Sequence, residues 1–180
     1  MNRMTIFISH IYHYDFTKLG LSTTILRFSV INLSMFLIPL IFDQPQIVIG
    51  SIINFLLIYI AFNFKNNELL PAIFLPAMAT VLRGALLGSS TPFLIFLMPL
   101  IWIANAIFVM SLRYFAILNW KIEKTLILSA ILKAGVLFSL SLIVIKALAL
   151  PEVLFLAMGP MQLLTAAIGS AVYMILQKKK

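Results

Sequence analysis

The sequence predicts an all-α, polytopic membrane protein, with six transmembrane helices in one bundle and both termini in the cytoplasm. Three observations predict this fold. Apolar residues make up 63% of the 180 residues and charged residues only 10%, whereas soluble domains have about 45–50% and about 25%. The apolar residues gather into stretches close to the roughly 20 residues that a helix needs to cross a bilayer. Lys and Arg concentrate in alternate connecting segments.

Each predicted helix is an apolar run that ends where charged, amide, Pro or Gly residues interrupt it. In chain order the interruptions fall at residues 43–46, 64–68, 88–92, 120–124 and 151–152. The six predicted helices are residues 21–41, 46–62, 69–87, 92–112, 125–148 and 153–176. The second and third are the shortest, so a smaller tilt or a partly re-entrant course stays open for them. Residues 21–176 thus form one transmembrane domain, between an N-terminal segment 1–20 and a basic tail 177–180.

The basic residues set the orientation of these helices. One side of the predicted bundle collects nine Lys and Arg residues, whereas the other collects Lys146, joined by Arg83 if that side chain reaches outward. Basic loops stay in the cytoplasm, so both termini are predicted to be cytoplasmic and the protein to be a multi-pass protein of the cell membrane. The nine residues are Arg3, Lys18, Lys65, Arg113, Lys121, Lys124, Lys178, Lys179 and Lys180.

The N-terminal segment 1–20 mixes aromatic and branched apolar residues with polar ones and lacks a signal-peptide pattern. Two interpretations stay open for it: a short helix in the cytoplasmic interface, where aromatic rings prefer to lie, or a loosely ordered leader.

Several classes of chemistry are excluded. The chain has no Cys, which removes disulfides, thiolate metal sites and cysteine nucleophiles. Its two histidines, His10 and His13, lie in the N-terminal segment, and the pair alone is too little for a metal site. The sequence has neither a Gly-rich phosphate loop nor paired carboxylates within the helices. We therefore expect no enzymatic activity, no metal and no cofactor. The net charge of +8 reflects membrane topology rather than nucleic-acid binding.

Ionisable residues inside the predicted helices are functional candidates, because charge at membrane depth is costly. No Asp or Glu lies in these helices, which argues against a proton- or cation-coupled carrier. Arg83, near the outer end of the third helix, either binds a carboxylate or phosphate or snorkels to the outer headgroups. Lys133, in the inner half of the fifth helix, is explained by snorkelling inward, with a place in a pocket as the alternative.

Amides are the remaining polar groups at depth. We expect Asn32 and Asn54 to hydrogen-bond between helices, whereas Asn105 and Gln162 lie near mid-depth and are better ligand candidates. Trp102 either walls a pocket or stacks on a ring, or faces lipid as apolar bulk.

Small residues recur every four positions in the third predicted helix and cluster in the sixth, where they allow close approach of helices. They serve either packing inside the bundle or docking of a separate membrane subunit. The residues are Ala72, Pro76, Thr80 and Gly84 in the third helix and Ala166, Gly169 and Ser170 in the sixth.

Three segments carry Pro, Gly, Asn and Gln in apolar surroundings: residues 44–54 (QPQIVIGSIIN), 91–106 (TPFLIFLMPLIWIANA) and 162–169 (QLLTAAIG). These segments resemble the substrate-binding S components of energy-coupling factor transporters. The resemblance covers most of the chain from Leu21 onward. It does not extend to the Ala-x-x-x-Ala docking pair of the family, which the first helix lacks.

The resemblance implies a vitamin- or micronutrient-binding protein that takes a small solute from outside, in a pocket between the outer halves of the later helices. It also implies partners: the lipid bilayer, a membrane coupling subunit and ATPase subunits. Together with the polar residues at depth, it suggests Arg83, Trp102, Asn105, Lys133 and Gln162 as substrate-binding residues. The alternative is a structural scaffold similar to the rod-shape-determining membrane protein MreD, without a ligand pocket. A lipid-modifying or flipping protein is disfavoured by the lack of catalytic groups.

Overall fold

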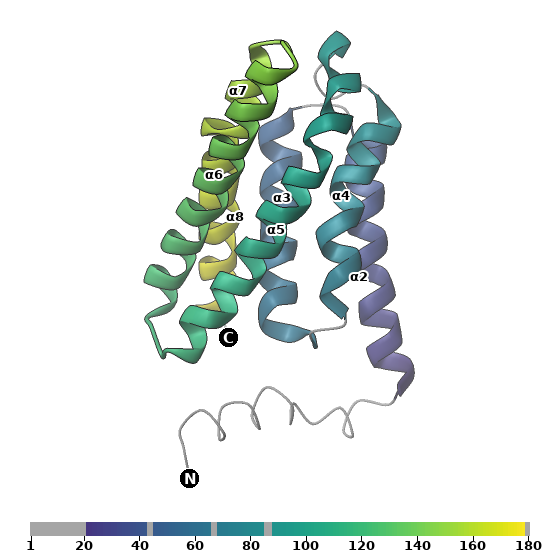
Figure 1. The fold of residues 1–180 in the computed structure, drawn as a ribbon. Coiled ribbons are helices and arrows are strands. Elements are labelled where there is room, and N and C mark those ends of the chain that lie inside the picture. Colours follow the sequence, from purple (N-terminus) through teal and green to yellow (C-terminus); the bar gives the residue numbers. More distant parts are fainter. Residues whose placement is uncertain (1–20, 43–44, 66–67, 85–87, 179–180) are drawn as a thin grey trace.

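A computed structural model describes residues 21–42, 45–65, 68–84 and 88–178. The predicted N-terminal interfacial segment, the loop residues Asp43 and Gln44, and the last two lysines of the basic tail lie outside these residues. Within the described part, the chain is helical and contains no strand, as the all-α prediction requires. The helices run up and down side by side, joined by short connections (Figure 1).

The elements follow the predicted order with shifted boundaries. The first predicted helix, 21–41, has the bounds of α2, and the second ends one residue later than predicted. In chain order the elements are α2 (Leu21–Ile41), α3 (Gln46–Asn63), α4 (Leu69–Arg83), the 3-10 helix η2 (Gly88–Phe93), α5 (Leu94–Ile117), α6 (Ile122–Ala147), α7 (Val153–Met158) and α8 (Pro160–Gln177).

Two predicted boundaries are wrong for identifiable reasons. The third helix was expected to reach residue 87, but α4 ends at Arg83 because Gly84 adopts a left-handed conformation with φ of 72°, which terminates helices readily. The fourth was expected at 92–112, but Pro92 lies in η2 and the α-helix extends from Leu94 to Ile117.

The sixth predicted helix, 153–176, is broken in two. Gly159 separates α7 from α8 with φ of −111° and ψ of −96°, and Pro160 opens α8, a position that suits Pro because its missing N–H needs no partner there. A Cβ atom at Gly159 would lie 2.6 Å from the ring of Phe138 on α6. The break therefore places α6 directly against the α7–α8 junction.

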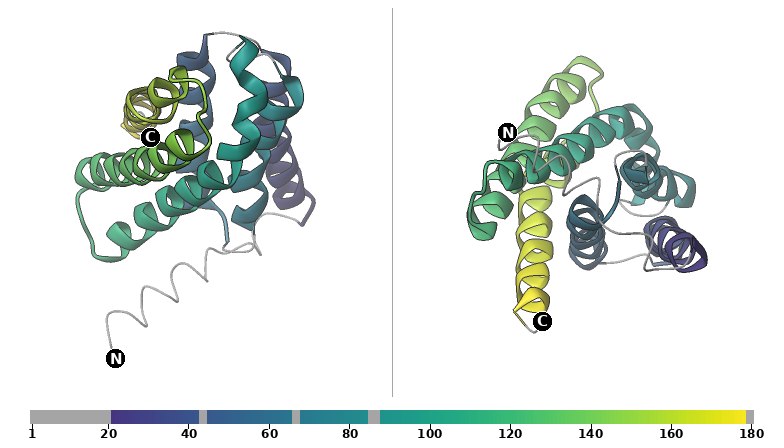
Figure 2. Two further views of the ribbon diagram at one scale, coloured as in Figure 1. Left: turned by 45° about the horizontal axis from the view of Figure 1, so that its top comes forward. Right: turned by 90° about the horizontal axis from the view of Figure 1, so that it is seen from below.

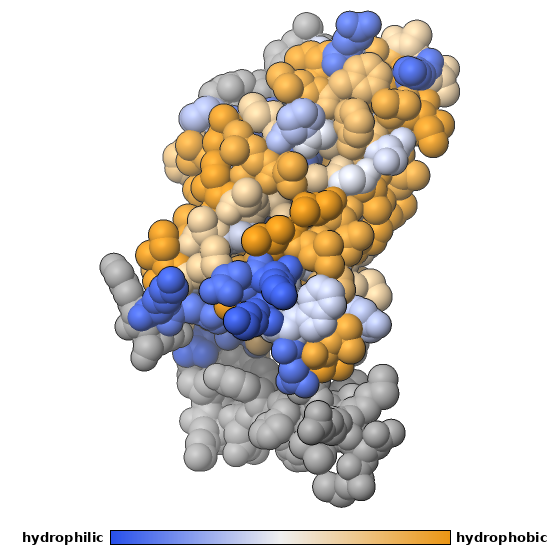
Figure 3. All heavy atoms as spheres, turned by 90° about the vertical axis from the view of Figure 1, so that its left-hand side faces the viewer, coloured by the Kyte–Doolittle hydropathy of each residue, from blue (hydrophilic) through white to orange (hydrophobic). Residues whose placement is uncertain are grey.

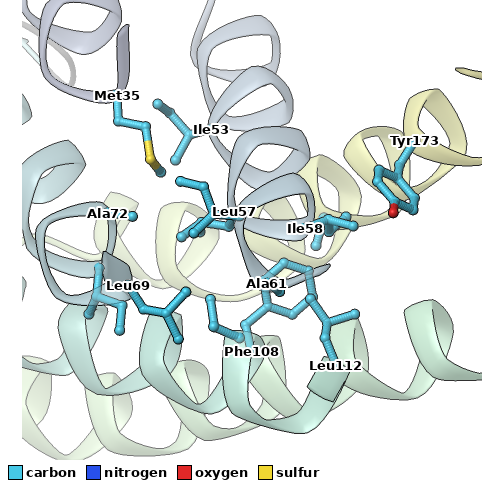
Figure 4. Close-up of a cluster of buried hydrophobic side chains, with 14 of the residues drawn as sticks. Met35, Ile53, Leu57, Ile58, Ala61, Leu69, Ala72, Phe108, Leu112 and Tyr173 are labelled. Carbon is cyan, nitrogen blue, oxygen red and sulfur yellow. The ribbon is translucent and has the colours of Figure 1, made fainter. Parts of the chain in front are cut away.

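The bundle is organised around α3, which packs mainly against α8 and also against α5, while α2 packs against α4 and α5 against α6. Figure 2 shows α2 and α4 on one side of α3, and α6 and α8 on the other. Buried side chains from six helices, α3 among them, meet in one cluster, part of which Figure 4 shows. Leu57 and Ile58 of α3, Phe108 and Leu112 of α5 and Met35 of α2 are among them. A second buried cluster joins α5, α6 and α7.

The surface has the polarity of a membrane protein. Large apolar side chains are exposed on every described helix from α2 to α8, including Leu26, Leu82, Met110, Ile143 and Ile175. Figure 3 shows apolar residues covering one face of the bundle, between hydrophilic groups at its two ends. Such a band matches the hydrocarbon layer of a bilayer.

Four segments of the described chain are long and apolar enough to cross a membrane: α3, α5, α6 and Val153–Lys178, which contains α7 and α8. The apolar part of α2, Ile25–Ile41, and α4 are shorter. These helix lengths are those of a membrane protein in which at least four segments are long enough to cross the bilayer.

Candidate functional site

A cavity of about 90 Å³ lies inside the bundle, lined by side chains from α2 to α8. Its polar lining residues are Gln46, Asn54, Thr80, Asn105, Lys133 and Gln162. The lining comes from the first halves of α3 and α5, the second half of α4 and the start of α8. Because neighbouring helices alternate in direction, these halves share one end of the bundle, the end where α7 lies (Figure 1).

Lys133 brings a cation into this cavity. Its side chain is only 2% exposed, near the middle of α6. Its Nζ donates a 2.6 Å hydrogen bond to Asn54 Oδ1 and lies 5.1 Å from the ring centroid of Phe108, within cation–π range. Lys133 was expected to snorkel inward, and the structure contradicts that interpretation, because the ammonium group lies between helices and does not reach an interface.

Asn54 connects three helices. Its amide nitrogen donates to Gly50 O at 2.9 Å and to Thr165 Oγ1 on α8 at 3.0 Å, while its oxygen accepts from Lys133 on α6. Thr165 Oγ1 in turn donates to the backbone oxygen of Gln162 at 3.2 Å. The expected role of Asn54 in hydrogen bonding between helices is therefore seen, and the same residue also lines the cavity.

Asn32 was also expected to hydrogen-bond between helices, but it bonds within its own helix. Its amide nitrogen bonds Phe28 O within α2, and its buried Oδ1 has no partner among the described residues. No hydrogen bond between helices is recorded for Asn32 within the described part of the chain.

Asn105 and Gln162 both line the cavity, on α5 and α8. Asn105 is 2% exposed, and its amide nitrogen donates to Ile73 O on α4 at 3.2 Å. This bond orients the side chain and leaves its oxygen without a protein partner among the described residues. The side-chain amide of Gln162 likewise makes no hydrogen bond to a described residue.

Two of the five predicted site residues lie outside the cavity lining. Arg83 Nη1 donates to Leu40 O at 2.6 Å, so the guanidinium group contacts the last turn of α2, where backbone carbonyls lack helical partners. Trp102 donates its indole N–H to Phe74 O at 3.2 Å and meets the Phe74 ring edge-on at 4.9 Å. Both residues link neighbouring helices in this structure.

The cavity includes residues that sequence reasoning did not assign to a site. Asn54 was assigned only to hydrogen bonding between helices, and Thr80 was noted only as a small residue. Gln46 was noted only at the start of the second predicted helix and within the segment 44–54. Their helical positions gave no indication that they face the same space as Lys133. No cluster of three or more His, Cys, Asp or Glu side chains occurs in the part of the chain that the structure describes.

No family model matches the sequence, and neither a curated protein nor a solved structure is significantly similar to it. The function is therefore argued from the geometry of the cavity.

Proposed function

We propose that this protein is the membrane-embedded solute-binding subunit of an uptake transporter, similar to an S component. The single observation that carries the proposal is a cavity in the bundle into which Asn54, Asn105, Lys133 and Gln162 converge from four helices. Small-molecule sites are concave, mostly apolar and carry a few convergent polar groups. Polar and charged groups inside a transmembrane bundle mark substrate pathways.

The charge distribution supports an orientation in which the cavity faces outward. Among the described residues, Lys65, Arg113, Lys121, Lys124 and Lys178 lie at or near the end of the bundle opposite α7. With that end in the cytoplasm, the cavity lies in the outer half of the membrane, where a binding subunit would collect an external solute. In this proposal six crossings are made by α2, α3, α4, α5, α6 and the α7–α8 segment, with both termini inside.

The short helix α4 is compatible with a crossing. Its 15 residues span about 22 Å at a rise of roughly 1.5 Å per residue, less than the roughly 30 Å hydrocarbon thickness. Local thinning of the bilayer accommodates such a mismatch. The adjoining η2 continues the chain at the outer end, after a gap outside the described residues.

The coupling partners belong to the same proposal. Because the sequence lacks a Gly-rich phosphate loop, energy for uptake would come from a separate membrane coupling subunit and its ATPase subunits.

The scaffold alternative is less favoured in this proposal, since most of the small residues that could hold a protein partner are buried inside the bundle, with Gly84 exposed. Ala72 and Pro76 of α4 are buried, and Ala72 is fully inaccessible. Gly169 faces α3 so closely that a Cβ atom there would lie 2.8 Å from backbone atoms of Ser51 and Phe55.

The proposal is tested by ligand-induced stabilisation of the purified protein in lipid nanodiscs. A panel of vitamins, nucleobases and small carboxylates is screened by thermal unfolding, because a bound ligand stabilises by RT ln(1 + [L]/Kd). A compound that raises the midpoint is then measured with Asn105→Leu, which should weaken binding at least tenfold. Asn63→Leu is the matched control, since Asn63 is an exposed asparagine near the end of α3 that bonds only its own helix, at Tyr59 O.

The proposal fails if no compound in the panel shifts the midpoint and affinity purification from the native membrane recovers only cell-shape proteins. It also fails if Asn105→Leu and Asn63→Leu bind the selected compound equally well, because the cavity would then not be its site.

A further inference from the structure

We propose that the cavity binds the carboxylate group of a small, singly charged organic anion, with the Lys133 ammonium group as its charge partner. This inference rests on the proposed function and names the class of solute. The observation that carries it is a lysine buried in the bundle beside the cavity, with no carboxylate among the described residues to neutralise it.

The positive charge of Lys133 is not balanced by the described part of the protein. The carboxylates described there are Glu68, Glu123 and Glu152, which all lie at helix ends, whereas Lys133 lies near the middle of α6. Among the described residues its Nζ makes one hydrogen bond, to Asn54, although an ammonium group has three donors. An ionised group in a low-dielectric interior is strongly unfavourable unless it is paired and hydrogen-bonded. A bound anion would supply both the charge and the missing acceptors.

Asn54 orients the ammonium group without neutralising it. Its amide nitrogen is held by Gly50 O and Thr165 Oγ1, so its oxygen is the atom that faces Lys133. An amide oxygen contributes a dipole but no net charge. The Phe108 ring, 5.1 Å away on the α5 side, likewise attracts a cation only through its quadrupole. The lysine is therefore held in place with its charge still available.

The charge of the lining selects a monoanion. Among the described residues that line the cavity, Lys133 is the single charged one, so one carboxylate neutralises this lining and a dianion leaves it with an unpaired negative charge. Arg83, the other cation expected at a site, contacts Leu40 O and does not line the cavity.

The neutral polar groups suggest how the rest of the solute is recognised. The Gln162 amide can donate a second hydrogen bond to the carboxylate, and Asn105 Oδ1 can accept one from a hydroxyl or amine on the solute. The cavity volume of about 90 Å³ is smaller than the roughly 150 Å³ cavity known to hold benzene. It therefore fits a carboxylate with a few further heavy atoms, and larger acids would have to displace helices.

The test compares three probes on the full chain in nanodiscs, at constant pH and ionic strength: propionate, its neutral isostere propionamide and the dianion malonate. Propionate should raise the thermal midpoint of the wild-type protein, whereas propionamide should have no effect and malonate should bind at least tenfold more weakly than propionate. Lys133→Met should abolish the propionate shift and raise the midpoint without ligand, because an unbalanced buried charge is removed. Lys146→Met, an exposed lysine at the outer end of α6, should leave the propionate shift unchanged.

Two outcomes overturn the inference. One is an equal shift of the midpoint by propionamide and propionate. The cavity would then bind solutes, but binding would not depend on a negative charge. The other is a Lys133→Met protein that is less stable than the wild type and still responds to propionate. Lys133 would then stabilise the fold and would not bind the carboxylate. Lys133→Gln replaces Lys133→Met if the latter does not fold. If no probe acts while a neutral compound from the wider panel binds, this inference alone fails. If nothing in either series binds and affinity purification recovers only cell-shape proteins, the proposed function fails too.

Discussion

The side chains of Lys133 and Asn54 are joined by a 2.6 Å hydrogen bond although they are 79 positions apart in the sequence. This contact ties the middle of α6 to α3, and Asn54 continues the connection to Thr165 on α8. Because both partners are almost fully buried, the bond is shielded from water, and removing Asn54 alone should be more damaging than removing both side chains.

Asn54→Leu is therefore expected to destabilise the protein by about 3 kcal/mol, since a hydrogen bond to a charged group contributes about 1.5–3 kcal/mol and its loss leaves the buried ammonium group without that acceptor. The double variant Asn54→Leu, Lys133→Met should recover most of that loss, because the charge has been removed as well. Equilibrium unfolding of the wild type, both single variants and the double variant gives the coupling energy. Additive single effects would show that the two side chains do not depend on each other.

Two glycines should respond in opposite ways to the same substitution. A Cβ atom at Gly169 would lie 2.8 Å from Phe55 N and Ser51 O on α3, and backbone atoms cannot move aside locally. Gly169→Ala should therefore destabilise by about 2 kcal/mol, within the usual range for overpacking. Gly135→Ala, in α6, meets nothing within 4 Å and should stabilise by about 0.5–1 kcal/mol through helix propensity. Thermal unfolding of the two variants measures both, and equal effects would contradict the close α3–α8 contact.

Arg113 should stabilise the C-terminal end of α3. Its Nε donates to Ala61 O at 2.7 Å, and its Nη2 donates to Phe64 O, so one guanidinium group satisfies two carbonyls at the helix C-terminus. Arg113→Met should cost about 2 kcal/mol, in line with hydrogen bonds to charged groups.

Arg113→Lys should recover only part of this loss, because an ammonium group lacks the planar fork. Lys121→Met, at an exposed site, is the control and should be neutral in the same unfolding measurement. A full recovery by Arg113→Lys would mean that charge alone is sufficient there.

The absence of Cys from the sequence allows the orientation to be measured with single cysteines. A membrane-impermeant maleimide should label Glu152→Cys, in the connection before α7, in intact cells. It should label Lys124→Cys, at the start of α6, only after permeabilisation. The reverse pattern would place the cavity in the cytoplasmic half and remove the argument for uptake, and labelling of both in intact cells would contradict a crossing by α6.

Much of the fold was predictable because hydropathy is a property of the local sequence. The apolar runs and their interruptions located the helices, often to within a few residues, and α2 matches its predicted bounds. The errors occur where backbone geometry intervenes within an apolar run. Gly84 ends α4 early, and the Gly159–Pro160 step divides a run whose hydropathy alone suggests one continuous helix.

The candidate site was only partly predictable. Polarity at membrane depth singled out Asn105, Lys133 and Gln162, which do line one cavity. It also singled out Arg83 and Trp102, which instead bond backbone carbonyls of neighbouring helices. Depth along a helix can be estimated from sequence, but the direction of a side chain around the helix cannot, because a helix in lipid can be apolar on all sides.

The sequence by itself indicated a helical chain with the composition of a membrane protein, because its balance of apolar and charged residues is far from that of soluble domains. Only the tertiary structure decided which polar groups meet. Lys133 reaches Asn54 and does not snorkel to an interface, and the small residues of α4 and α8 close the bundle internally. These outcomes depend on the rotation and pairing of helices, which are set by packing between residues far apart in the chain.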